Sequence, residues 1–290
     1  MVIALARVPV SSPTFTPLSY GLLSAADIVT EGSSRWTGGI EFIPDACEEA
    51  GITTSPCPAT GSIHKSPNVT GVDVRGADPF TVFADILCSP VGFDEDEFKA
   101  RTTAALTNGE ARAAERVFWT GVAGAATVNP HLAEDTAVTD ARGVLLQSAA
   151  SLVITGAAIS VTRALGLLEG SLAECYGGEG VIHVPREALA HLGAVTNVVR
   201  DGQRLRTLSG NIIAAYSSNN KEGPTGAEAT LGEGWFYATG ALSIRRSGID
   251  YVSAYTEAVD RSENTMVYIA ERTYVVNWDC CHFAVRVALA

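Results

Sequence analysis

The sequence lacks any apolar run long enough to cross a bilayer as a helix, and it lacks a cluster of lysine and arginine residues. Its 290 residues include 20 basic residues against 32 acidic ones, which gives a formal net charge of −12. Proteins that bind nucleic acid regardless of its sequence use a cationic surface to hold the phosphate backbone. We therefore expect neither a membrane-spanning helix nor sequence-general binding to nucleic acid.

Cysteine is also scarce, and its spacing excludes a disulfide scaffold and the common zinc sites. The six residues form no CxxC pair; they are Cys47, Cys57, Cys88, Cys175, Cys280 and Cys281. The adjacent Cys280 and Cys281 are expected to point to opposite faces of one strand. The N-terminal residues, interrupted early by Pro9, do not resemble a secretory signal peptide. These features predict reduced, structural cysteines in a protein made in a reducing cytoplasm.

An enzyme signature is missing as well, although one cluster suggests a mechanism. Cys280 and His282 lie two residues apart on one expected strand face, and a Cys–His pair can act as a nucleophile when the imidazole reaches the thiol. Neighbours along a strand point in parallel directions, so burial is the simpler role for Cys280. The glycine-rich run 177–180 follows a predicted helix and precedes a strand, the reverse of the order in a phosphate-binding loop. A cytosolic α/β enzyme with Cys280 as nucleophile stays open as an alternative.

The strongest element that the sequence predicts is a helix over residues 94–119. Four acidic residues open it, and Arg112 and Arg116 lie near its end, which suits the helix dipole. One apolar face is predicted from residues at helical spacing: Ala100, Ala104, Ala111, Ala114 and Phe118. Gly109 interrupts the pattern, but the stripe continues in phase after it. We therefore predict one long, kinked helix.

Other segments carry signals for shorter elements. A second helix is predicted over residues 160–176, where Ser160 is a good N-cap and glycines follow. The pairs Asp201-Gly202 and Thr239-Gly240, each between apolar flanks, predict β-hairpin turns. Strands are predicted over residues 80–88, 180–184, 212–216, 266–277 and 283–289.

The first third of the chain does not have the pattern of a compact domain. Residues 1–35 are rich in serine, proline and threonine, and residues 36–79 are interrupted by glycines and prolines without a convincing helix. A stretch this long without secondary structure is unusual inside a compact domain. We therefore expect residues 1–35 to form an extended arm, and residues 36–79 to project and pack on neighbouring subunits.

The order of these elements resembles the major capsid protein of tailed bacteriophages. The stretches that carry the likeness most specifically are PFTVFADILCSPVG (79–92), EARAAERVFWTG (110–121) and YVVNWDCCHFAVRVALA (274–290). They are similar to capsid proteins of phages of actinobacteria in particular. Encapsulin nanocompartments share this shell fold, and the correspondence of elements covers nearly the whole chain.

The resemblance implies an α+β fold of four parts, the tailed-phage major-capsid fold. These parts would be an N-terminal arm (1–36), an extended loop over the adjacent subunit (37–80), a peripheral domain (81–140 and 246–290, with the spine helix at 94–119) and an axial domain (141–245). Candidate residues for the contacts between subunits are Trp36, Lys65, Arg112, Arg116 and Trp119.

The resemblance also implies a structural role without catalytic residues, metal or cofactor. Copies of the chain would form pentamers and hexamers of an icosahedral phage head that encloses double-stranded DNA, in a virion assembled in the host cytoplasm. Portal and decoration proteins would be its partners, and a separate scaffold or none is expected because the chain begins almost at the arm. The alternative is an encapsulin-type shell, which would show an apolar cargo groove beside the arm and spine helix.

Some relatives join their shells by an isopeptide bond between a lysine of the extended loop and an asparagine of a neighbour. Lys65 is the only lysine in residues 37–80, and Asn277 lies in the closing strands. The reaction also needs a buried carboxylate to accept the lysine proton. Glu271 lies roughly 20 Å from Asn277 along an extended strand, and Asp279 is closer but expected to be solvated. We therefore predict no cross-link.

Overall fold

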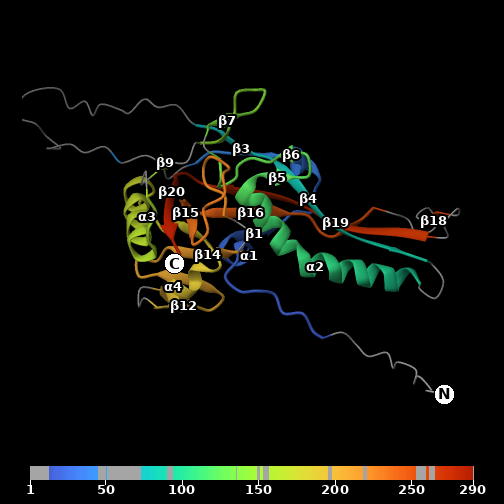
Figure 1. The fold of residues 1–290 in the computed structure, drawn as a ribbon. Helices are drawn as coiled ribbons and strands as arrows, with labels where there is room; N and C mark the ends of the chain where they lie inside the picture. The colour runs from blue at the N-terminus through green and yellow to red at the C-terminus, as the bar shows by residue number, and fades with distance from the viewer. Residues whose placement is uncertain are drawn as a thin grey trace, which may run out of the picture.

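The computed structural model describes residues 13–44, 50, 73–89, 94–134, 136–148, 151–152, 157–194, 198–217, 221–252, 259–260 and 265–289. The molecule extends from a broad lobe at one end to a narrow part made of one long helix and long strands (Figure 1). None of the helices in these ranges is long and apolar enough to span a membrane. The helices are α1 (Leu22–Ala25), α2 (Glu95–Thr120), α3 (Val161–Cys175) and α4 (Ala188–Ala194), with a 3-10 helix η1 (Arg35–Gly38).

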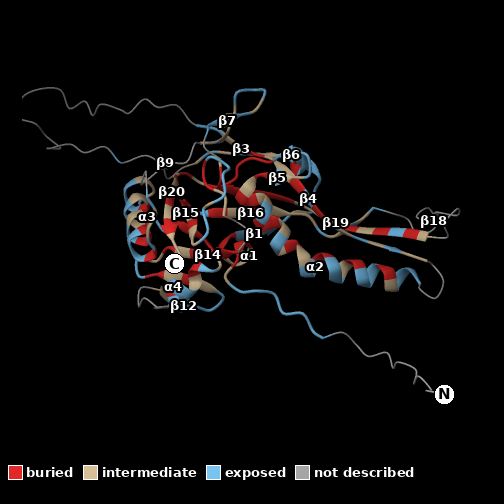
Figure 2. Ribbon diagram, viewed as in Figure 1, coloured by how far each residue is buried: buried red, intermediate tan, exposed pale blue. Residues whose placement is uncertain are grey.

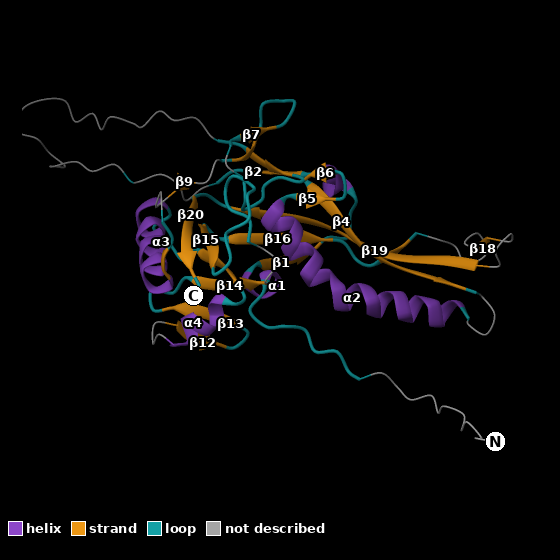
Figure 3. Ribbon diagram, in the orientation of Figure 1, coloured by secondary structure: helices purple, strands orange, loops and turns teal. Residues whose placement is uncertain are grey.

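A six-stranded sheet runs from the middle of the molecule into the narrow part, and α2 packs on its strands β4 and β19 (Figure 3). Its strands are β1 (Asp27–Thr30), β4 (Pro79–Cys88), β16 (Leu242–Arg246), β17 (Asp250–Tyr251), β18 (Val259–Asp260) and β19 (Thr265–Trp278). β19 pairs antiparallel with β4, from Met266 opposite Cys88 to Val275 opposite Pro79. Near the start of α2, Phe98 packs on Met266 and Tyr268, which fixes the helix against the sheet.

The broad lobe is built on an eight-stranded sheet in the order β10-β20-β15-β11-β14-β13-β12, with β9 also paired to β20. Leu165, Leu168 and Leu172 of α3 pack against this sheet, and a larger buried core lies between α2 and the two main sheets (Figure 2). The strands are β9 (Ser151–Leu152), β10 (Ile159–Ser160), β11 (Val181–Pro185), β12 (Val198–Asp201), β13 (Arg204–Thr207), β14 (Ile212–Tyr216), β15 (Glu233–Thr239) and β20 (His282–Ala288).

Two small sheets complete the described fold. One has the order β2-β3-β8-β7, in which β2 (Ile40–Phe42) pairs antiparallel with β3 (Arg75–Ala77) and so joins the two ends of the predicted extended loop. The other strands of this sheet are β7 (Val138–Thr139) and β8 (Leu145–Gln147). The second small sheet is a hairpin of β5 (Val122–Ala123) and β6 (Ala126–Thr127). Lys65 lies outside the described residues.

Several sequence predictions are confirmed. α2 is one continuous helix across Gly109, and its N-cap Asp94 accepts a hydrogen bond from the backbone N–H of Glu97 at 2.8 Å. α3, β4 and β14 lie where the patterns predict them, and β12 and β13 form the hairpin around Gly202. Gly202 has a φ of 58°, a conformation that glycine adopts without steric cost.

The apolar face predicted for α2 is wrong in its first half. Ala100 and Ala104 are exposed, and the buried stripe instead contains Phe98, Thr102, Leu106, Glu110, Ala114 and Phe118. The apolar pattern misses this stripe because it includes a threonine and a glutamate. Thr102 donates its hydroxyl to the carbonyl oxygen of Phe98 at 2.8 Å. A partner of this kind is what allows a polar side chain to be buried.

The hairpin predicted around Thr239-Gly240 is also wrong. β15 and β16 belong to different sheets, so the chain passes from the eight-stranded sheet to the six-stranded sheet at this dipeptide. A Cβ added at Gly240 would lie 2.6 Å from the carbonyl oxygen of Cys280, and this close approach of two backbone segments requires glycine. The closing segment 246–290 is divided in the same way, because β19 joins the six-stranded sheet and β20 the eight-stranded one. The boundaries of the peripheral and axial domains stay a prediction.

Candidate functional site

Helix α2 is anchored to β19 by an ion pair that is largely buried. Arg272 Nη1 lies 2.7 Å from Glu110 Oε2, and Tyr274 donates its hydroxyl to the same oxygen at 2.8 Å. Burial, together with the negative charge of Glu110, raises the pKa of Tyr274 to about 12. The hydroxyl therefore keeps its proton at neutral pH and stays a hydrogen-bond donor.

Glu115, further along α2, holds the arm and a loop of the broad lobe against the helix. Its carboxylate accepts hydrogen bonds from the backbone N–H groups of Leu22 and Ser217, each at 3.3 Å. Burial raises the pKa of Glu115, although both N–H donors act in the opposite direction. A Cβ added at Gly21 would collide with this carboxylate, so the arm approaches α2 at a glycine. One side chain thus connects three segments that are far apart in the sequence.

Trp119, predicted at a subunit interface, is fully buried inside the subunit. Its Nε1 donates to the carbonyl oxygen of Glu222 at 3.0 Å, and its ring makes T-shaped contacts with Tyr216 and Tyr237. This residue stabilises the junction between α2 and the broad lobe, and its role at a subunit interface stays a prediction. Trp36 is 7% exposed, and its ring packs with Ala77 and Val275 in a separate small core.

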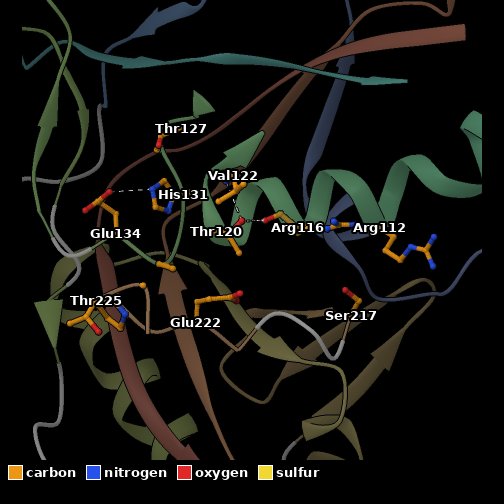
Figure 4. Close-up of a pocket in the computed structure, with 13 residues that line it drawn as sticks. Arg112, Arg116, Thr120, Val122, Thr127, His131, Glu134, Ser217, Glu222 and Thr225 are labelled. Carbon is orange, nitrogen blue, oxygen red and sulfur yellow. Dashed lines mark hydrogen bonds and ion pairs between the residues drawn. The ribbon is translucent and has the colours of Figure 1, made fainter. Parts of the chain in front are cut away.

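Arg112 and Arg116 are exposed, and both line a cleft of about 1130 Å³ (Figure 4). The cleft lies between the C-terminal half of α2, the β5–β6 hairpin with the segment that follows it, and residues 217 and 222–226. Neither arginine has an ion pair within the described part of the chain. The structure thus brings together two of the five predicted interface residues and leaves both available for contacts outside the subunit.

The wall of the same cleft contains a histidine that is held by an ion pair. His131 in its wall pairs with Glu134, with Nε2 lying 3.2 Å from Oε2, and Figure 4 shows this pair away from the arginines. Burial lowers the pKa of His131, although Glu134 acts in the opposite direction. No group of three or more histidine, cysteine or acidic side chains placed for a metal ion occurs in the ranges described above.

A second hollow, of about 530 Å³, lies between the arm and α2. Phe15 and Leu18 of the arm line it together with Ala105 and Ala111 of the helix. Phe15 is 50% exposed and Leu18 is 73% exposed, so the arm leaves apolar side chains open to water. This is the place where the sequence-based alternative, an encapsulin-type shell, expects a groove for cargo.

The Cys280–His282 pair is not arranged as a nucleophile and a base. Cys280 is disulfide-bonded and 2% exposed, and Cys175 forms a disulfide with Cys281, their Cα atoms 6.1 Å apart. The prediction that the cysteines are reduced is therefore wrong for these three residues. Cys281 lies in the turn between β19 and β20 with a φ of 63°. Since 106 residues separate Cys175 from Cys281, local spacing did not indicate this bond.

His282 is also unsuited to the role of a base. Burial lowers its pKa from 6.5 to about 4, and its ring lies against those of Trp278 and Tyr237. A base that is protonated only near pH 4 does not take a proton from a thiol at neutral pH. The residue belongs to an aromatic core rather than to a reactive site.

Similarity to solved structures extends over nearly the whole chain. No family model matches the sequence, and no curated protein matches it at a significant level. The capsid of a native GTA particle is similar over 99% of this chain and 96% of its own, with a TM-score of 0.58 and 10% identity. A structure of Microbacterium phage Oxtober96 is similar over 97% of this chain and 95% of its own, with a TM-score of 0.51 and 10% identity. A structure of Mycobacterium phage Adephagia is similar over 93% of this chain and 91% of its own, with a TM-score of 0.51 and 13% identity.

At these identities the similarity concerns the fold, and it agrees with the elements described above. The long helix on a sheet, the β2–β3 pair and the broad α/β lobe agree with a match over 99% of the chain. The chain therefore has the tailed-phage major-capsid fold that its sequence resemblance predicts.

Proposed function

We propose that this chain is a structural, non-catalytic protein, the major capsid subunit of an icosahedral phage head that encloses double-stranded DNA. Copies of it would associate as pentamers and hexamers, in a virion assembled in the host cytoplasm. The observation that carries the proposal is the similarity to the capsid of the GTA particle over 99% of the chain, arm included. Fold alone does not specify function, so the surfaces of the subunit must also suit assembly.

One face of the ribbon formed by β4 and β19 supports contacts between copies. Alternate residues of β4 point to opposite faces, so Phe80 and Val82 pack in the core while Phe83 and Leu87 face outward. Phe83 is 62% exposed and Leu87 is 63% exposed, and Val267, directly opposite Leu87, is 38% exposed. Exposed apolar side chains gathered on one face mark an interaction site. A shell would cover this face, whereas a lone subunit leaves it in water.

The proposal is tested by expressing the chain and following assembly by sedimentation and electron microscopy. Wild-type protein should form closed shells or isolated capsomers, and Phe83→Asp should prevent this while the subunit still folds by circular dichroism. Leu231→Asp is a matched control, because Leu231 is fully exposed on a loop and lies outside the ribbon. A compact monomer under all assembly conditions, for the wild-type chain, would refute the proposal.

The second candidate function is an encapsulin-type shell, favoured by the apolar hollow between Phe15 and Leu18 of the arm and helix α2. Such a hollow suits an apolar peptide segment of a cargo protein. The contents of purified particles separate the two functions. Double-stranded DNA that resists added nuclease supports a phage head, whereas particles without such DNA that retain one specific protein support the alternative. Leu18→Asp should release that protein only in the second case.

A further inference from the structure

The chain passes directly from one main sheet to the other at two places, and these two passages lie against each other. The first passage, between β15 and β16, contains Gly240 and Ala241; the second, between β19 and β20, contains Asp279, Cys280 and Cys281. Gly240 donates its backbone N–H to the carbonyl oxygen of Cys280 at 2.7 Å. Asp279 donates its backbone N–H to the carbonyl oxygen of Ala241 at 3.0 Å. The two passages therefore form one hydrogen-bonded junction between the sheets.

A covalent bond fastens the end of α3 to the second passage. Cys175 is the last residue of α3, and its disulfide partner Cys281 lies in the turn between β19 and β20. The hydroxyl of Tyr176 is hydrogen-bonded to the side chain of Asp279 and to the backbone of Ala241. α3 itself packs on β15 and β20 of the eight-stranded sheet (Figure 1). The disulfide thus ties a helix of the broad lobe to the point where the chain leaves the six-stranded sheet.

Non-covalent packing places the two cysteines side by side without help from the bond. The apolar face of α3 is held on the sheet by Leu165, Leu168 and Leu172, each at most 2% exposed. Cys281 packs against the same core, and the hydrogen bonds of Tyr176 hold the end of the helix at the junction. Reduction of the bond should therefore leave the fold intact, with two thiols in position to form it again.

Small thiols in solution can reach this bond. Cys175 and Cys281 are both partly exposed, whereas Cys280, which is also disulfide-bonded, is 2% exposed. A disulfide is reduced when a thiolate attacks one of its sulfur atoms, so exposed bonds are the labile ones. A cytoplasm keeps accessible cysteines reduced through its pool of small thiols. The proposed function places synthesis and assembly of the subunit in such a cytoplasm, and the inference below rests on it.

We propose that the Cys175–Cys281 bond is a redox-dependent latch, which is open while subunits fold and assemble in the cytoplasm and closes once the particle has left it. To close the latch, the thiolate of one cysteine attacks a low-molecular-weight disulfide outside the cell, and the other cysteine displaces the small thiol from the mixed disulfide. Two thiols of the chain become one disulfide, and the small disulfide takes up two electrons and two protons and leaves as two thiols. The closed latch fixes α3 to the junction between the sheets and so stabilises the completed shell.

The first test follows the redox state of Cys175 separately from that of the other cysteines. Trypsin should release it within residues 164–186, where it is the only cysteine. Cells that express the chain are quenched in acid, and the denatured protein is labelled with N-ethylmaleimide; purified particles treated with oxidised glutathione are labelled in the same way. We expect most of the Cys175 from cells to be labelled and most of that from the particles to be unlabelled. Cys88, a free cysteine, is the control and should be labelled in both samples.

The second test uses variants to measure what the closed latch does. A mild water-soluble reductant should lower the Tm of oxidised wild-type particles by about 4–8 °C, because the bond closes a long loop. The double variant Cys175→Ser with Cys281→Ser should lack this response and should still assemble at the same subunit concentration as the wild type. Cys88→Ser is the matched control, since it removes a free thiol, and it should keep the wild-type response.

Three results would overturn the inference. Cys175 could already be unlabelled in protein taken from cells, or it could still be labelled in the oxidised particles. The double variant could fold but fail to assemble, which would make the bond a requirement for assembly rather than a later latch. A wild-type chain that never assembles would instead refute the proposed function, while the labelling of Cys175 in cells and after oxidation would still decide the redox step.

Discussion

Glu110 and Arg272 form an ion pair between α2 and β19, across 162 residues of sequence, with only 7% and 14% of their side chains exposed. Removal of one partner leaves the other charge buried without a counter-ion, which costs about 3–5 kcal/mol. We predict that Glu110→Ala lowers the free energy of unfolding of the unassembled subunit by this amount in urea denaturation. The double variant Glu110→Leu with Arg272→Met should recover most of the loss, because it buries no charge. A loss below about 1 kcal/mol for the single variant would contradict this role.

The stability of the subunit should fall in mild acid because of His282. Its pKa is about 4 in the folded protein and 6.5 ordinarily, so between these values the unfolded chain binds more protons than the folded one. The stabilisation is therefore complete above about pH 6.5 and is lost as the pH falls to about 4, by roughly 3 kcal/mol in total. Urea midpoints measured from pH 4 to pH 7 should show a weaker pH dependence for His282→Gln than for the wild type. Parallel curves for the two proteins would show that His282 does not cause the effect.

Two glycines should respond in opposite ways to alanine. A Cβ at Gly240 would meet the backbone of Cys280, so we predict that Gly240→Ala lowers the unfolding free energy by about 1–3 kcal/mol through overpacking. Gly109 lies within α2 with nothing near its added Cβ. Gly109→Ala should therefore raise stability by about 0.5–1 kcal/mol through helix propensity. Thermal unfolding measures the stability of both variants. Equal effects at the two positions would be inconsistent with the close approach of the Gly240 and Cys280 backbones.

The disulfide between Cys175 and Cys281 should stabilise the broad lobe. It joins α3 to the turn between β19 and β20 and closes a long loop, so its removal should cost roughly 2–4 kcal/mol. We predict that the double variant Cys175→Ser with Cys281→Ser unfolds at a lower temperature than the wild type without reductant. Peptide mapping by mass spectrometry should find the bond in the wild type. Free thiols at both positions in native protein would contradict the structure.

Covalent joining of subunits through Lys65 is not expected. Its proposed partner Asn277 is 8% exposed, and Glu271 lies six residues away on the same strand. Particles boiled with reductant should therefore give a single band at the monomer mass on a denaturing gel. A ladder of multimers that disappears in Lys65→Ala would show that the bond forms.

The parts of the fold that the sequence predicted correctly depend on local signals. The acidic start and N-cap of α2, the apolar spacing of α3 and the aromatic, β-branched run of β4 all act within a few residues. The candidate interface residues have different surroundings in the structure. Arg112 and Arg116 are exposed at the cleft, but Trp119 is a core residue, because an aromatic side chain suits a core and an interface equally well.

The sequence by itself determined where the long helices and the longer strands form, and the order of those elements was enough to indicate the capsid fold. Only the tertiary structure decided which sheet each strand joins, since β15 and β16 separate at Gly240 although they are neighbours in the chain. It also decided that Glu110 is buried and that Cys175 is oxidised, because the partners of both residues lie more than a hundred positions away. Burial of a polar or reactive side chain depends on such distant partners, and a local pattern does not contain them.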